Sequence, residues 1–270
     1  MRRSSLVVLL LMGALAQAAT LEFRRDGTVV RTLDEAALAA ACRPRTVEID
    51  DPYYSAPKRY RACPLAAVLE AGFGAPPARL PGEDVLFRAL DGYVKPSTLA
   101  RAAEDGGFVA FGDVDRGGKF APLGRRGVDP GPFYVVWTKP AQRDTNVYPW
   151  PYQLAAIELT DFAKTFPHTV PSGVPADAPA WRGFAIFRTQ CAACHSVNGE
   201  GGTVGPDLNV PQSIVEYRPV EQVKAYIRNP ATFRYGNMPA HEDLSTDDLD
   251  ALIAYFRAMK DRKRDPGGRP

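Results

Sequence analysis

The sequence predicts a protein of two folded domains, an N-terminal α+β domain with a mixed sheet over residues 20–165 and a C-terminal all-α domain over residues 179–262. Three observations support this prediction. A chain of 270 residues suits two domains. Short strand-like and helical segments alternate in the first part, whereas the pattern is helical after residue 179. A proline-rich stretch, residues 166–178, lies between them and is typical of a stiff linker.

The start of the chain has the features of a secretory signal peptide, residues 1–19. Basic residues (1–3) precede an apolar run over residues 6–15, which is too short to span a membrane. A small-x-small motif ends at Ala18, so we expect cleavage near Ala18 or Ala19 and a periplasmic mature protein. An uncleaved anchor is the alternative.

The charge balance argues against nucleic acid as a partner. The whole chain carries 33 basic and 31 acidic residues, and cleavage would remove two arginines and no acidic residue. The mature protein would therefore have no net charge at pH 7. The last residues, 263–270, are basic and then rich in proline and glycine, so we expect a disordered tail.

In the N-terminal domain, turn residues and apolar alternation predict each element in order. Asp26-Gly27 favours a hairpin, and Pro64 and Gly72 bound a short helix. The expected strands are residues 21–25, 28–31, 45–49, 84–90, 108–111, 133–137 and 153–159, and the expected helices are residues 33–41 and 64–71.

In the C-terminal domain, three helices are expected. The first contains Phe184 and precedes a pair of cysteines, and the second covers residues 220–227 and ends before Pro230. The third opens with a capping box at Ser245 and continues with apolar residues on one face.

The motif that carries the chemistry is Cys191-Ala-Ala-Cys194-His195, the C-x-x-C-H attachment sequence of c-type haem. Two thiols at this spacing can bond the two vinyl groups of one haem. His195 then lies beneath the iron as proximal ligand, for which a neutral imidazole is suited. The single motif predicts one covalently bound haem c.

A C-x-x-C pair alone is also compatible with a redox disulfide or half of a zinc site. A structural zinc site needs about four protein ligands. Beyond His195, the chain offers only His168 and His241 and no second C-x-x-C pair. A thioredoxin-like motif would need a preceding βαβ pattern, which the sequence does not have.

The sixth iron ligand is predicted to be Met238. Met1 and Met12 lie in the leader, and Met259 falls on the apolar face of the last predicted helix. Met238 instead lies in a loop, between glycine and proline residues. Ligation by histidine and methionine closes both axial positions and favours electron transfer. His241 is the competing ligand.

The stretch of residues 177–262 resembles a class I cytochrome c. Phe184 is similar to the aromatic residue that packs the first helix on the last, and Tyr255-Phe256 to the aromatic pair of the last helix. Residues 205–208 resemble the loop whose proline carbonyl accepts a hydrogen bond from the proximal imidazole.

The resemblance implies that Pro206 orients His195 and that Pro206 and Leu208 belong to the haem-binding residues. A class I fold, an electron-carrier role and a redox partner protein follow from it as expectations.

The N-terminal domain resembles, over residues 45–160, the molybdopterin-binding domain of the sulfite oxidase family. The motifs that carry the resemblance are residues 59–65, 87–93, 132–137 and 150–159. The cysteine loop that holds molybdenum in that family has no counterpart here. We therefore expect a relative without cofactor. Its aromatic segments, residues 51–54 and 148–152, are compatible with a binding surface or with packing under loops.

The two remaining cysteines, Cys42 and Cys63, are expected to form a disulfide in the oxidising periplasm. The leading hypothesis is a periplasmic carrier of single electrons between a dehydrogenase and a downstream acceptor, docked by its N-terminal domain. A molybdenum-dependent oxidoreductase with a fused haem domain, using Cys42 or Cys63 as thiolate, is the alternative. A haem-based sensor is a third possibility.

Overall fold

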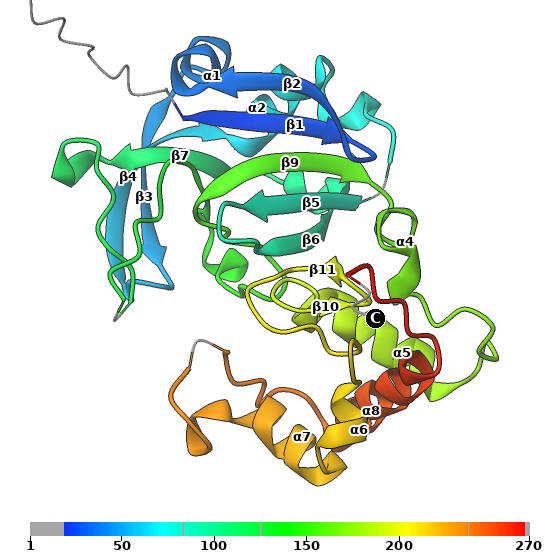
Figure 1. The fold of residues 1–270 in the computed structure, drawn as a ribbon. Helices are drawn as coiled ribbons and strands as arrows, with labels where there is room; N and C mark the ends of the chain where they lie inside the picture. Colours follow the sequence, from blue (N-terminus) through cyan, green and yellow to red (C-terminus); the bar gives the residue numbers. More distant parts are fainter. Residues whose placement is uncertain (1–18, 83, 125, 237, 268–270) are drawn as a thin grey trace, which may run out of the picture.

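The computed structural model describes residues 19–267 except 83, 125 and 237, and the predicted leader lies almost wholly outside this part (Figure 1). Residues 20–160 form two sheets with short helices, and residues 179–260 are mainly helical. The predicted α+β and helical halves are thus confirmed.

The first sheet has five strands in the order β2-β1-β9-β5-β6. The predicted hairpin around Asp26-Gly27 is confirmed, because β1 pairs antiparallel with β2 across this turn. β1 also pairs parallel with β9, so the sheet is mixed. The strands are β1 Thr20–Arg25, β2 Thr28–Asp34, β5 Asp84–Ala89, β6 Val94–Thr98 and β9 Leu154–Thr160.

The second sheet has four antiparallel strands in the order β3-β4-β7-β8. The strands are β3 Arg45–Asp51, β4 Ala56–Pro64, β7 Gly107–Asp113 and β8 Tyr134–Trp137. Helices α1 Glu35–Cys42 and α2 Leu65–Phe73 pack against each other beside the sheets. A disulfide joins Cys42, at the end of α1, to Cys63 in β4, with the two Cα atoms 5.7 Å apart.

Two features of the N-terminal half differ from the sequence prediction. Helix α2 ends at Phe73 and is capped by Gly74, whose φ of +76° suits glycine, whereas the sequence predicted its end at Gly72. Gly72 lies inside the helix because Phe23 packs there, where a Cβ would come within 1.9 Å of the ring. Strands β4 and β6 were not predicted. Proline argues against a strand, but β6 is an edge strand, which tolerates Pro96.

The C-terminal half is built on the pair α5 Pro179–Ile186 and α8 Thr246–Lys260. The predicted capping box of α8 is confirmed, since the Ser245 hydroxyl accepts from the Asp248 N–H at 3.1 Å. The smaller elements are α3 Leu99–Ala102, α4 Phe162–Thr165, β10 Ser196–Val197, β11 Glu200–Gly201, α6 Ile214–Tyr217 and α7 Val220–Arg228.

The first part of the segment predicted as a linker packs against the helical half, whereas residues 172–173 and 175–177 are exposed. Thr169 is fully buried, and its carbonyl accepts a hydrogen bond of 2.7 Å from the Tyr255 hydroxyl on α8. The His168 backbone N–H donates to the Glu200 carboxylate of β11 at 2.7 Å. At the chain end, Arg264 donates its backbone N–H to Asn198 at 3.0 Å, so part of the predicted tail also makes contacts.

Candidate haem site

The C-x-x-C-H motif begins at the end of a helix. Helix α5 continues into a π-helical turn, Phe187–Cys191, and the N–H groups of Cys194 and His195 both donate to the Cys191 carbonyl, at 3.1 and 2.9 Å. Both cysteines are free and partly buried. The turn therefore holds both thiols and the imidazole on one short, hydrogen-bonded segment.

The two thiols are neutral at pH 7. Burial raises the pKa of Cys191 to about 12 and that of Cys194 to about 11. Thiolates, and not thiols, bind metals well. Within the part of the chain that the structure describes, no group of three or more histidine, cysteine or carboxylate side chains could hold a metal ion. The described residues therefore contain no side-chain cluster of the kind that a structural zinc site needs.

His195 is oriented by the loop that follows it. Its Nδ1–H donates to the Pro206 carbonyl oxygen at 2.8 Å, which leaves Nε2 of the neutral ring without a proton. Burial lowers the pKa of His195, so the ring is a neutral imidazole. The adjacent Gly205 makes room for the ring, since a Cβ there would lie 2.4 Å from His195 Cε1.

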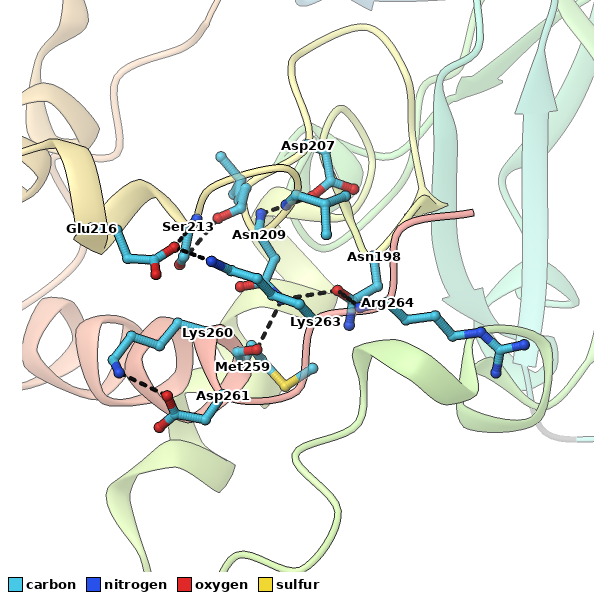
Figure 2. A network of polar contacts seen from close by, with 12 residues as sticks. Asn198, Asp207, Asn209, Ser213, Glu216, Met259, Lys260, Asp261, Lys263 and Arg264 are labelled. Carbon is cyan, nitrogen blue, oxygen red and sulfur yellow. Dashed lines mark hydrogen bonds and ion pairs between the residues drawn. The ribbon is translucent and has the colours of Figure 1, made fainter. Parts of the chain in front are cut away.

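Asparagine side chains hold this loop in place (Figure 2). Asn209 Nδ2 donates to Asn198 Oδ1 and to the Met259 carbonyl on α8, both at 2.8 Å. Asp207 accepts the N–H groups of Gly199 and Asn209, both at 2.7 Å. The carbonyl that orients His195 is thus fixed to the last helix. Sequence reasoning missed these residues, because an Asn pair in a loop looks like ordinary turn chemistry.

The remaining predicted residues of the site lie around the apolar core of the helical half. Leu208 and Met238 both pack against it in partly buried positions. His241 is only 5% exposed, and its N–H donates to the Ile227 carbonyl at 3.2 Å. Burial lowers the pKa of His241, whereas the nearby Asp243 raises it. His241 thus stays the competing ligand, and Met238 as sixth ligand stays a prediction.

The N-terminal half also reaches the site. Lys95, in β6, donates from Nζ to the Thr189 carbonyl at 2.9 Å, in the turn that presents Cys191. The Val94 N–H donates to the Ala193 carbonyl, between the two cysteines, at 2.9 Å. No sequence signal pointed to these contacts, because they depend on how two distant segments pack.

Comparison with known proteins identifies the helical half. Residues 180–260 match the family described as cytochrome c. This part of the chain is a cytochrome c domain. It contains all five residues of the C-x-x-C-H motif, as well as Pro206, Leu208 and Met238.

Two curated relatives were found. Cytochrome c oxidase subunit 2 of Alkalihalophilus pseudofirmus is 37% identical over 93 residues, which are 32% of this chain and 27% of that protein. Thiosulfate dehydrogenase of Thiomonas intermedia is 34% identical over 99 residues, 34% of this chain and 30% of that protein. The chain thus matches less than a third of the length of either relative.

The residues of the cytochrome c domain fit a covalently bound haem c, which such a domain implies. Two free thiols precede an imidazole whose Nε2 is unprotonated, and Gly205 leaves space for that ring. Cys191 and Cys194 would form the thioethers, and His195 would hold the iron. The group would supply one-electron chemistry.

The N-terminal half is a mixed-sheet region, and its resemblance to the sulfite oxidase family stays a prediction. Its aromatic segments serve packing in part. Trp150 is 1% exposed and donates to the Gln142 carbonyl at 3.1 Å, and Tyr148 stacks edge-on against Trp137. Among the described residues, no helix is long and apolar enough to cross a membrane.

Proposed function

We propose that the chain is an exported, periplasmic c-type cytochrome with one haem, which carries single electrons between a periplasmic dehydrogenase and a downstream acceptor. The observation that carries the proposal is the geometry of His195. Its Nδ1 is committed to the Pro206 carbonyl and its Nε2 is free, on the same turn as two unpaired thiols. One attachment motif supports a single haem.

Met238 is proposed as the sixth ligand, with His195 as the fifth. Its partly buried position against the cluster that also contacts Cys191 and Leu208 supports this assignment. An iron closed on both faces favours electron transfer over binding of oxygen or substrate. A sensor would instead need an exchangeable ligand at this position.

The N-terminal region is proposed to dock the redox partner without binding molybdenum. Cys42 and Cys63 are joined to each other, and a disulfide offers no thiolate to a metal. The alternative enzyme, a molybdenum oxidoreductase with a fused haem domain, would need one of these thiolates.

The test is export of the full chain in a host that attaches haem c, followed by extraction with acidified organic solvent and by metal analysis. We expect one haem per chain that stays with the protein, reversible one-electron reduction and no molybdenum. Extractable haem would contradict the covalent attachment. Stoichiometric molybdenum in protein from the native host would make the chain an enzyme.

A further inference from the structure

A hairpin of the N-terminal half contacts the haem-attachment segment. This hairpin joins β5 to β6 and is closed by the Gly92 N–H, which donates to the Ala89 carbonyl at 3.2 Å. The Thr203 N–H donates to the Gly92 carbonyl at 3.0 Å, and Val94 donates to Ala193 on the other side. Figure 1 shows β6 as the strand of the first sheet nearest to β10 and β11. Two backbone bonds thus join a sheet edge to the attachment segment.

The contact between the hairpin and the cytochrome c domain is close. A Cβ on Gly92, which has a φ of +89°, would lie 2.1 Å from the Thr203 hydroxyl oxygen. Asp84 of β5 and Arg188 of the π-helical turn form an ion pair at 2.5 Å. Leu86 and Val94 belong to the apolar core of the cytochrome c domain. The two halves therefore share a core, as a permanent contact does.

Lys95 places a buried cation at this contact. The residue is 4% exposed, and none of the ion pairs found among the described residues includes it. Its hydrogen bond goes to the Thr189 carbonyl, in the last turn of a helix, where the helix dipole favours a positive charge. Burial lowers the pKa of Lys95. Thr189 lies two residues before Cys191, so the hydrogen bond places the ammonium beside the attachment segment.

Tyr93 lies in this hairpin between Gly92 and Val94, whose backbone groups bond to Thr203 and to Ala193, the residue before Cys194. Burial raises the pKa of Tyr93. The rings of Tyr53 and Tyr152 meet edge to face, with centroids 5.9 Å apart.

We propose that the N-terminal half forms a second wall of the haem site. Tyr93 and the residues beside it in the hairpin keep water from the Cys194 edge of this site. Lys95 is a positioning residue that favours the reduced iron. The inference rests on the proposed function and gives the N-terminal half a role at the haem site of its own chain, in addition to docking a partner. Ferric haem carries one more positive charge than ferrous haem. A nearby cation in a medium of low dielectric constant therefore opposes oxidation. Water, which stabilises the more highly charged form, acts in the opposite direction.

The experiment is a spectroelectrochemical titration of the full-length holoprotein and its variants. Lys95→Met should lower the midpoint potential, because it removes the charge and keeps the length of the side chain, whereas Lys95→Arg should restore most of it. Lys139→Met is the matched control, because Lys139 is exposed and pairs with exposed Asp105. The midpoint potential of this control variant should equal that of the wild type. Tyr93→Ala should lower the potential by admitting water.

A Lys95→Met potential equal to the wild-type value, in protein whose haem is not extractable, would overturn the role of Lys95 and leave the proposed function standing. Extractable haem would instead overturn the proposed function. Amide hydrogen exchange of the wild type tests the wall without any variant. The N–H groups of Val94 and Thr203 should be strongly protected, and exchange at the rate of an open loop would refute the wall.

Discussion

Loss of the Cys42–Cys63 disulfide should destabilise the N-terminal half by about 3 kcal/mol. The bond closes a loop with a sequence separation of 21, and in the chain-entropy model a loop of this size restricts the unfolded chain by roughly 3 kcal/mol. The Cα separation of 5.7 Å lies in the common range for disulfides. For a domain of this size the midpoint of thermal unfolding should fall by roughly 6–12 °C on reduction.

Calorimetry of the holoprotein with and without reductant measures this change, and haem absorbance follows the cytochrome c domain separately. The double variant Cys42→Ala/Cys63→Ala controls for side effects of the reductant. It should unfold slightly earlier than the reduced wild type, because Cys63 is fully buried and the smaller side chain loses packing. Titration of the unfolded holoprotein under non-reducing conditions should find no free thiol. Two free thiols would refute the reasoning.

Three other predictions concern single residues. Cys194→Ala should leave haem attached through Cys191 alone and shift the absorbance bands to longer wavelength, because one vinyl group stays conjugated; a spectrum identical to that of the wild type would contradict attachment at Cys194. Met238→Ala should open the iron to small ligands and lower the potential, since the thioether favours reduced iron; an unchanged spectrum would assign the ligand to His241, and His241→Ala is the matched control. Burial raises the pKa of Asp51 above its ordinary 3.8, despite hydrogen bonds from Tyr60 and Tyr134. A raised acid pKa gives stability that is present at low pH and lost as the pH rises through the folded-state value. The difference in unfolding free energy between the wild type and Asp51→Asn should therefore change as the pH rises from 3.8 through the higher folded-state pKa of Asp51. A difference that does not change with pH would refute the raised pKa.

Local patterns predicted the elements whose structure is decided locally. The Asp26-Gly27 turn gave a hairpin because both residues accept positive φ, and Ser245 began a helix because its hydroxyl caps a free N–H group. The haem motif was readable for the same reason, since Cys191, Cys194 and His195 lie on one turn. Such features depend on few neighbours, all of them close in sequence.

Strand β6 shows what local patterns cannot reveal. It carries Pro96, which argues against a strand, and Lys95, which in a sequence resembles a solvated surface charge. Whether that lysine meets water depends on what covers the sheet edge, and the covering turn begins 92 residues later, at Phe187. Burial then changes the physical meaning of the residue, because a cation that water would screen becomes a charge that acts on the attachment site. The proline-rich segment before Pro179 is held in place at its start. Thr169 is buried and its carbonyl is bonded to Tyr255 of α8, whereas residues 172–173 and 175–177 are exposed. A docked partner would therefore meet both halves as one surface, and an electron would reach the iron through an environment to which both contribute.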